Sequence, residues 1–246
     1  MNREELQKEA LNNLLALSKN EYPGRGIICG LDETGLYFVQ VGWIMGRSTD
    51  SRNRVYVEES NGMVKTAAAD PAIPVKKPEL TLYPAMMESD GIFVVSNGHQ
   101  TSDALKELRK TEFMRLENWE YEPDAPNFTP RITAGFSTVG VARLLMSLIS
   151  KDPSSDDCRT VCCDFNFPEK GLGYCLTTYS GNGDPLPSFE GEPYLLPLLG
   201  DAKNVAEVIW ANLNEDNRVA IVVKFIDIET GQSHIHIINK YEQVAG

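Results

Sequence analysis

The sequence predicts an antiparallel α+β domain with helices that cover sheets. Three observations support this fold class. Strand-like apolar runs come in pairs, separated by turn signals such as Asp32-Glu33-Thr34-Gly35 and Glu229-Thr230-Gly231. A few segments with helical spacing of apolar residues lie between these pairs. The chain has 246 residues, 42% of them hydrophobic, which suffices for one large domain with a substantial core.

The first predicted element is an amphipathic helix over residues 4–18. Its apolar side chains fall on one stripe at helical spacing: Leu6, Ala10, Leu14 and Leu17. Pro23-Gly24 ends this region.

The remaining elements follow from apolar runs bounded by turn residues. The predicted strands are residues 26–30, 37–45, 54–57, 91–95, 133–137, 159–165, 173–178, 218–227 and 233–239. The predicted helices are residues 103–118, capped by Thr101 or Ser102, and residues 202–213. Residues 141–150 fit a strand or a helix. The predicted irregular segments are a surface excursion over 67–78, a polar loop over 151–157 and a Gly/Pro-rich loop over 181–197.

Composition bounds the partners of the protein. The chain carries 23 Lys+Arg against 35 Asp+Glu, a net charge of −12, so most of its surface repels nucleic acid. No apolar run approaches the ~20 residues of a membrane span, and the acidic N-terminus lacks the apolar core of a secretory signal. The odd number of cysteines, five, favours reduced thiols. We therefore expect a cytoplasmic protein that binds neither nucleic acid nor membrane.

An arginine cluster stands out in this acidic chain. Arg47, Arg52 and Arg54 fall within the segment 46–54. Because the planar guanidinium binds phosphate or carboxylate through two parallel hydrogen bonds, the cluster suggests a site for one small anion. A solvated loop with surface ion pairs remains the alternative.

Two further segments offer polar groups. Ser96-Asn97-Gly98, between a strand and a helix, could form an anion cradle from backbone N–H groups, or be an ordinary turn. In the segment 121–131, three prolines fix the backbone and present Glu122, Asn127 and Arg131. A carboxylate near arginines could serve as a positioned base, whereas the alternative is a rigid connector.

Several common sites are not predicted. There is no Gly-rich dinucleotide fingerprint, phosphate-loop lysine motif or Gly-x-Ser-x-Gly elbow. Cys162 and Cys163 point to opposite faces of a strand, and no third ligand accompanies His234 and His236. We therefore expect no metal.

Four short motifs, in this order, resemble the archaeal-type IMP cyclohydrolase family, including its bacterial IMP cyclohydrolase-like members. They are Tyr22-Pro23-Gly24-Arg25, Arg47-Ser48…Asn53-Arg54, Val94-Val95-Ser96-Asn97-Gly98 and Asn127-Phe128-Thr129-Pro130-Arg131-Ile132. The resemblance covers residues 22–135.

The resemblance implies a fold and a reaction. The fold is a four-layer αββα sandwich similar to N-terminal-nucleophile hydrolases, without the processed nucleophile. Residues 1–21 would be a helical extension and residues 22–246 a single domain. The reaction closes the purine ring of 5-formamidoimidazole-4-carboxamide ribotide to give IMP and water, in purine biosynthesis. It requires no metal or organic cofactor, and its partner is a phosphate-bearing ribonucleotide.

The resemblance also implies roles for individual residues. Arg54, Tyr83 and Glu122 correspond to catalytic residues: Glu122 as base or proton relay, Tyr83 as hydroxyl donor, Arg54 as the group that orients and polarises. The implied substrate-binding residues are Arg25, Arg47, Asn53, Ser96, Asn97, Asn127 and Arg131.

The chain departs from the family pattern in three places: residues 1–21 precede the first motif, Pro84 follows Tyr83, and long loops occupy 151–200. Two alternatives therefore stay open. One is a non-catalytic ribonucleotide-binding protein of the same fold. The other is an αββα-class amide hydrolase, which needs a nucleophile freed at a mature N-terminus, whereas Cys29 lies within a predicted strand. Whether the protein is a homo-oligomer is also left open.

Overall fold

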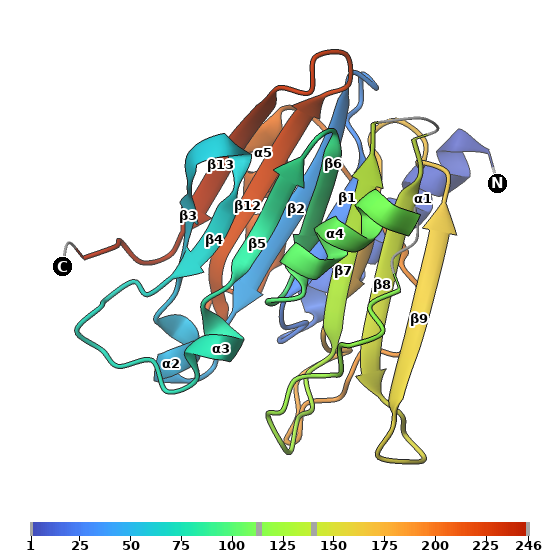
Figure 1. Cartoon of the computed structure of the whole chain (residues 1–246). Coiled ribbons are helices and arrows are strands. Elements are labelled where there is room, and N and C mark those ends of the chain that lie inside the picture. Colours follow the sequence, from blue (N-terminus) through green and yellow to red (C-terminus); the bar gives the residue numbers. More distant parts are fainter. Residues whose placement is uncertain (1, 112–114, 139–141, 245–246) are drawn as a thin grey trace.

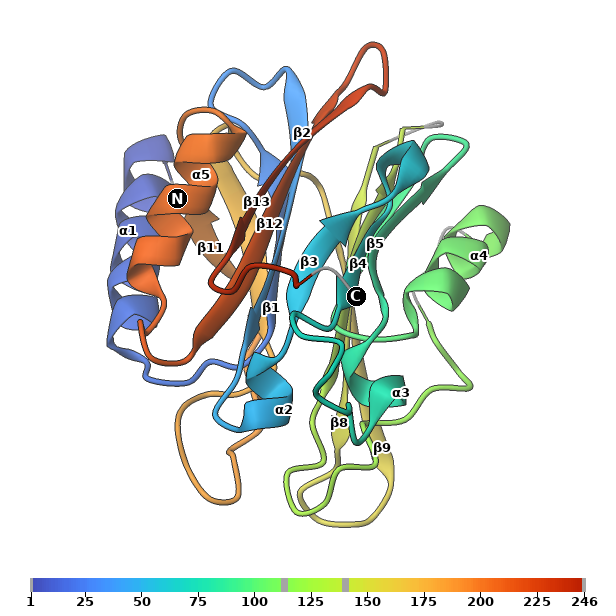
Figure 2. The same cartoon turned by 90° about the vertical axis from the view of Figure 1, so that its left-hand side faces the viewer.

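The computed structural model describes residues 2–111, 115–138 and 142–244, and two antiparallel sheets dominate them (Figures 1 and 2). The six-stranded sheet has the order β11-β10-β1-β2-β12-β13 and the seven-stranded sheet the order β3-β4-β5-β6-β7-β8-β9. The expectation of a mixed fold with antiparallel sheets is confirmed.

The bounds of the strands are as follows. The six-stranded sheet contains β1 (Gly26–Leu31), β2 (Tyr37–Met45), β10 (Leu172–Thr177), β11 (Tyr194–Pro197), β12 (Arg218–Asp227) and β13 (Ser233–Asn239). The seven-stranded sheet contains β3 (Val55–Glu58), β4 (Val64–Ala67), β5 (Pro84–Ser89), β6 (Ile92–Ser96), β7 (Arg131–Ser137), β8 (Leu144–Lys151) and β9 (Cys158–Phe165).

Helices lie outside the two sheets. Helices α1 (Arg3–Lys19) and α5 (Ala202–Asn212) cover the outer face of the six-stranded sheet, and α4 (Thr101–Thr111) covers that of the seven-stranded sheet (Figure 2). The layer order is therefore helix, sheet, sheet, helix. Kinship with N-terminal-nucleophile hydrolases stays a prediction, as does the division into an extension and one domain.

One large core lies between the sheets, and strands of both contribute apolar side chains to it; another lies between the six-stranded sheet and helices α1 and α5. Ile27 and Ile44 from the six-stranded sheet pack with Met86 and Met146 from the other, all almost fully buried. Tyr83 belongs to the same core, with 2% of its surface exposed. The pairing of β1 with β2 also fixes Trp43, whose Nε1 donates to the Gly24 carbonyl at 3.0 Å. Trp43 packs with residues of α1 and α5, so this contact holds the segment that precedes β1 against the helix-covered face of the six-stranded sheet.

The structure corrects two predicted elements and decides a third. Helix α4 ends at Thr111, and residues 115–118 are not helical although the sequence predicts a helix through 118; residues 112–114 lie outside the described part. The chain folds back here, with Trp119 Nε1 donating to the Asp103 carboxylate at 3.1 Å. The predicted loop 181–197 contains β11, which reaches strand geometry only by pairing with the edge of β10. Residues 144–151 are strand, which settles the ambiguity over 141–150 within the described range.

Five short elements were not predicted: α2 (Thr49–Arg52), the 3₁₀ turn Ser60–Gly62, α3 (Pro78–Thr81), β4 and β5. Both helices have four residues, too few to show apolar periodicity. Both lie near the same end of the sheets (Figure 1), where the candidate site is found. None of the described helices combines the length and apolar character that crossing a membrane requires.

Candidate functional site

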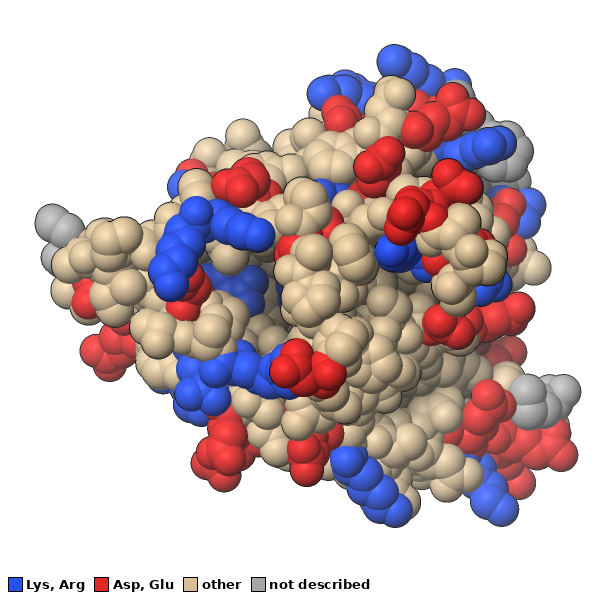
Figure 3. All heavy atoms as spheres, turned by 90° about the horizontal axis from the view of Figure 1, so that it is seen from below, with Lys and Arg blue, Asp and Glu red and all other residues tan. Residues whose placement is uncertain are grey.

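A pocket of about 410 Å³ opens between α2, α3, the segment before β1 and the segment 122–129. Figure 3 shows Lys and Arg atoms around and inside a recess on this face. The cations that line the pocket are Arg25, Arg47, Arg54, Lys76 and Lys77. The acidic residues that line it are Asp50, Glu122 and Asp124. The pocket therefore concentrates positive charge in a chain of net charge −12.

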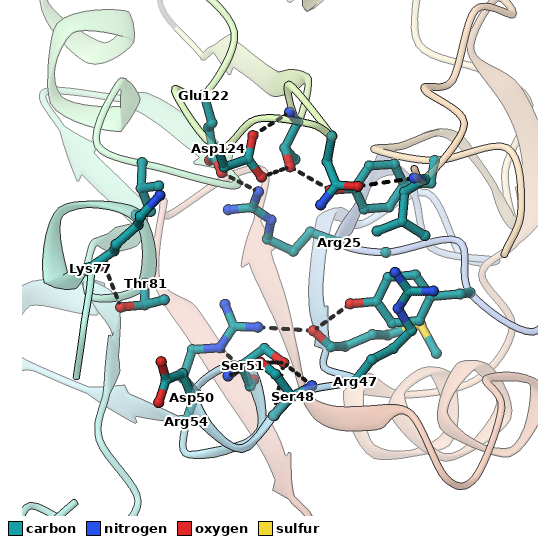
Figure 4. A pocket seen from close by; sticks show the side chains of 18 of the residues that line it. Arg25, Arg47, Ser48, Asp50, Ser51, Arg54, Lys77, Thr81, Glu122 and Asp124 are labelled. Atoms are coloured by element: carbon teal, nitrogen blue, oxygen red, sulfur yellow. Dashed lines mark hydrogen bonds and ion pairs between the residues drawn. The ribbon is translucent and has the colours of Figure 1, made fainter. Parts of the chain in front are cut away.

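Arg25 and Glu122 form a buried ion pair on one side of the pocket (Figure 4). Arg25 Nη2 lies 2.7 Å from Glu122 Oε2, and Nη1 donates to the Asn97 carbonyl at 2.8 Å. Burial opposes the charge of Arg25, but the Glu122 carboxylate outweighs it and holds the pKa of Arg25 well above its usual range. This cation is therefore fixed in both place and charge.

One carboxylate oxygen of Glu122 makes no hydrogen bond to the described residues. Its Oε1 lies 3.7 Å from Arg131 Nη1, beyond hydrogen-bonding distance, and has no hydrogen-bond partner among the described residues. Only 3% of the residue surface is exposed. A buried carboxylate oxygen without a partner is costly unless a ligand supplies the donor.

Arg54 lies across the pocket from Arg25 (Figure 4). Its Nε donates to the Ser51 carbonyl and its Nη2 to the Met45 carbonyl, each at 2.9 Å. Burial lowers the pKa of Arg54; the Tyr83 hydroxyl opposes this shift and the charge of Arg25 adds to it. None of the described ion pairs neutralises Arg54, so an anion in the pocket would relieve an uncompensated buried charge.

Tyr83 carries the second unpaired polar atom near the pocket. Its backbone N–H donates to Thr66 Oγ1 at 2.8 Å, but its buried hydroxyl has no hydrogen-bond partner in the described part of the chain. This hydroxyl interacts electrostatically with both guanidiniums, raising the pKa of Arg25 and opposing the fall in the pKa of Arg54. Tyr83 therefore shares the environment of the two arginines, although it does not itself line the pocket wall.

Arg47 lines the pocket on the side opposite Lys77 (Figure 4). Its guanidinium lies 5.0 Å from the centre of the Tyr22 ring, and Nη1 donates to Asn182 Oδ1 at 2.7 Å and to the Gly183 carbonyl at 2.9 Å. Burial raises the pKa of Tyr22 against the pull of the surrounding arginines. Arg47 is thus held by one nitrogen and by stacking, with its remaining N–H groups able to contact a ligand.

Ser96 and Asn97 do not line the pocket. Asn97 Oδ1 accepts from the Ile132 N–H at 2.9 Å and its Nδ2 donates to the Pro130 carbonyl at 2.8 Å. Ser96 Oγ lies 2.5 Å from Thr101 Oγ1. Both side chains are buried and their hydrogen bonds join β6 to β7 and α4. Only the backbone carbonyl of Asn97 contacts a pocket residue: it accepts a hydrogen bond from the guanidinium of Arg25.

Asn127 and Arg131 both follow Glu122 in the sequence, but they occupy different positions in the structure. Arg131 is buried behind Glu122, stacks 4.7 Å from the Trp119 ring centre and donates through Nε to the Glu120 carbonyl at 2.7 Å. Asn127 lines the pocket and accepts from the Leu186 N–H at 3.0 Å.

Asn53 is turned away from the pocket. Its side chain is paired with the backbone of Asp70, through Oδ1 at 2.7 Å and Nδ2 at 3.0 Å. The neighbouring Arg54 does enter the pocket, so adjacent residues of one motif have different tasks.

Sequence reasoning missed several residues that line the pocket. Lys76 and Lys77 fall within the predicted surface excursion over 67–78. A pair of lysines just before a proline that starts a helix, in an acidic chain, was the available signal. Tyr179 has no motif around it, and its pKa is raised by burial.

The described residues contain no group of three His, Cys, Asp or Glu that could hold a metal ion. His234 and His236 lie on β13 at the edge of the six-stranded sheet, apart from the pocket.

Fold and site together define a mixed α/β protein with a cation-lined pocket of small-molecule size, in which buried arginines face unpaired polar atoms. Residues 22–232 match the IMP cyclohydrolase-like protein family, and the chain belongs to that family. The suspected resemblance is thereby confirmed, and it extends well beyond residue 135. A comparison with curated proteins finds none that matches this chain.

Proposed function

We propose that this protein is an IMP cyclohydrolase, which closes the purine ring of 5-formamidoimidazole-4-carboxamide ribotide and releases water. One observation carries the proposal: Glu122 Oε1 and the Tyr83 hydroxyl are buried without a hydrogen-bond partner among the described residues, and Arg25 and Arg54 line the neighbouring pocket. An acceptor, a donor and two cations are what the reaction needs. The family membership is consistent with it.

The reaction joins two groups of the same molecule. The carboxamide nitrogen attacks the formyl carbon, a C–N bond forms, and the carboxamide proton passes to the formyl oxygen. The formamido nitrogen then loses its proton as the hydroxyl leaves, so that one C=N bond and one water are formed. Because the attack is intramolecular, holding both groups in a reactive arrangement supplies much of the acceleration.

The proposed roles follow from hydrogen-bonding capacity. Glu122 Oε1 accepts the carboxamide N–H and takes or relays its proton. The Tyr83 hydroxyl and the Arg54 guanidinium donate toward the formyl oxygen, where negative charge develops. Arg25 holds Glu122 in place and can orient the carboxamide.

The 5′-phosphate is assigned to the cation-rich rim. Arg47, Lys76 and Lys77 line the pocket in more exposed positions than Arg25 and Arg54. A dianion there is attracted by several cations without the desolvation that deep burial would cost.

The test is direct conversion of the formylated ribotide by the purified protein, with IMP followed by absorbance and chromatography. We expect product in proportion to protein concentration. Absence of product above the uncatalysed rate at several protein concentrations would refute the enzyme assignment. Tight IMP binding in that case would favour a non-catalytic ribonucleotide-binding protein.

A further inference from the structure

One wall of the pocket is formed by the segment from Ala69 to Lys77, which joins β4 to α3 and is here called the strap. Its last two residues, Lys76 and Lys77, line the pocket. Figure 4 shows Lys77 with Thr81 on the flank of the pocket opposite Arg47. The strap therefore brings two cations to a pocket that already holds three arginines.

A buried asparagine anchors the first half of the strap. Asn53 Oδ1 accepts from the Asp70 N–H at 2.7 Å, and Nδ2 donates to the Asp70 carbonyl at 3.0 Å. The Asn53 carbonyl also accepts from the Ala69 N–H at 3.4 Å. A side-chain amide is suited to this two-way pairing with one residue because it carries both a donor and an acceptor.

The C-terminal segment supplies a second anchor. The Val244 N–H donates to the Ala69 carbonyl at 2.8 Å, and Ala69 is 5% exposed. Val244 lies beyond the region 22–232 that matches the family. Ala69 is thus clamped between the end of α2 and the C-terminal segment.

At the end of the strap the backbone is held, since the Lys77 carbonyl accepts from the Leu80 N–H at 3.0 Å and from Thr81 Oγ1 at 2.9 Å, but the Lys76 side chain is held only weakly. Lys76 has 82% of its side chain exposed, and its ion pair with Asp50 has a separation of 3.8 Å. Such exposed pairs contribute little because water and salt screen them. A phosphate dianion in the pocket would compete well for this ammonium group, since it offers more charge and more acceptors.

We infer that the strap is the phosphate-recognition element of the site, in which Lys76 and Lys77 contact the phosphate of the ligand and Asn53 is a positioning residue that acts through the strap. The inference rests on the proposed function for the identity of the ligand. The sequence suggested that Asn53 contacts the substrate directly, whereas this inference gives it an indirect role through the strap.

The first test uses the product and its dephosphorylated form. Binding of IMP and of inosine is measured by calorimetry for wild type and for Lys76→Ala/Lys77→Ala. We expect IMP affinity to fall about tenfold or more, as the loss of charge-assisted hydrogen bonds requires, with inosine affinity unchanged. Lys203→Ala, a lysine on α5 with 63% of its side chain exposed, is the matched control and should change neither affinity. Equal losses for both ligands, or no loss for IMP, would overturn the inference.

The second test addresses Asn53. Asn53→Ala should increase hydrogen exchange in the peptide covering 68–77 and weaken IMP binding selectively. Added to the double lysine variant, it should cause little further loss, because both changes act through the same contact. Asn13→Ala, which removes a hydrogen bond to the Leu195 carbonyl at 3.0 Å far from the strap, is the control for a general loss of stability. Fully additive losses, or an inosine affinity that falls in parallel, would contradict a positioning role.

Binding of pyrophosphate, a third ligand, distinguishes a failure of this inference from a failure of the proposed function. If wild type binds IMP or pyrophosphate in a strap-dependent way but closes no ring, only the cyclohydrolase assignment fails. If wild type closes the ring and the lysine substitutions leave KM for the ribotide unchanged, only the strap inference fails. If wild type binds neither IMP nor pyrophosphate, the strap has no phosphate to recognise and the inference fails as well.

Discussion

At the scale of single residues, the site is defined by which buried charges are compensated. Arg25 is neutralised by Glu122 at 2.7 Å, whereas Arg54 donates only to backbone carbonyls in its described hydrogen bonds. Burial lowers the pKa of Arg54, which records the cost of holding this charge without an anionic partner. Such uncompensated charges concentrate at functional sites, and here the charge faces the pocket.

Removing the two unpaired polar groups should act on chemistry and not on affinity. Tyr83→Phe and Glu122→Gln keep the shapes of the side chains but remove a hydroxyl and a charge. We expect kcat to fall by ~10²–10⁴-fold, the usual contribution of a general acid–base group, with little change in ligand affinity. Single-turnover kinetics with the formylated ribotide would measure this step.

Folding must be verified for both variants, because the loss of one buried network can resemble a catalytic defect. An unchanged thermal transition is the criterion. The control variant is Tyr37→Phe. Tyr37 packs against Phe225 and does not line the pocket, so this substitution should leave kcat unaltered. If both site variants keep nearly wild-type kcat, the assignment of the chemistry is wrong even for an active cyclohydrolase.

Arg47 and Arg54 should respond differently to truncation. Arg47 is stacked on Tyr22 and bound to Asn182 at the rim, so Arg47→Ala should chiefly raise KM, since phosphate is bound equally in ground and transition states. Arg54→Ala should change both kcat and KM because it is proposed to polarise the formyl oxygen. Steady-state kinetics over a range of ribotide concentrations distinguishes the two. An Arg47 variant that loses only kcat would contradict the phosphate assignment.

At the scale of elements, the β1–β2 turn illustrates how one carboxylate fixes a hairpin. Asp32 accepts from the Thr34 N–H at 3.0 Å and from the Tyr37 N–H at 2.9 Å, and its own N–H donates to the Tyr37 carbonyl at 3.1 Å. Burial opposes its ionisation, but these hydrogen bonds and that of the Thr34 hydroxyl prevail and lower the pKa of Asp32 below 3.8. The turn therefore depends on the charged form.

This dependence predicts an acid-sensitive hairpin. Because the pKa of Asp32 is lower in the folded than in the unfolded chain, its contribution is complete above about pH 3.8 and is lost as pH falls through the folded-state pKa. Asp32→Asn should destabilise the protein by about 1–2 kcal/mol at pH 7 and less at acid pH. Urea unfolding at pH 7 and near pH 3 measures this difference. A variant whose deficit grows on acidification would contradict the assignment.

The elements that the sequence predicts well are those whose contacts are local. The hairpins β1–β2 and β12–β13 have long apolar runs and turn residues between them, so both were placed nearly to the residue. β5 and β11 were missed because they begin or end with proline and gain their geometry from neighbouring strands. The fold of the sheets was thus predictable in outline, whereas its short partners depend on tertiary pairing.

The site was also predictable in part, because some of its residues stand in local sequence motifs. Arg25, Arg47, Arg54, Glu122 and Asn127 stand in recognisable motifs, and the structure gathers them around one pocket. The motif alone does not tell which of its residues faces inward, so Asn53 and Asn97 were assigned to the ligand although their side chains bind backbone groups. The lysines of the strap have no motif, and only the folded chain brings them to the pocket.

At the scale of the whole molecule, the negative net charge of the chain contrasts with the positive charge that the fold gathers at the pocket. The chain is strongly acidic, yet cations from segments far apart in sequence converge where α2 and α3 meet the ends of the sheets (Figures 1 and 3). Low-dielectric walls focus the field of such a cluster. The surrounding negative surface disfavours long polyanions, which would have to follow it beyond the pocket. The whole molecule should therefore select small anions.

This selectivity gives a prediction that needs no variant. Inorganic phosphate or sulfate should inhibit ring closure competitively, raising the apparent KM for the ribotide without lowering kcat, because the anion occupies the proposed phosphate position. Ionic strength must be held constant with chloride, since screening alone weakens electrostatic attraction. A DNA oligonucleotide, with its many phosphates, should bind and inhibit poorly at the same phosphate concentration, because a net charge of −12 repels it. Inhibition that lowers kcat, or that DNA matches at equal phosphate concentration, would show that the cations act as a general surface charge and not as a site for one small anion.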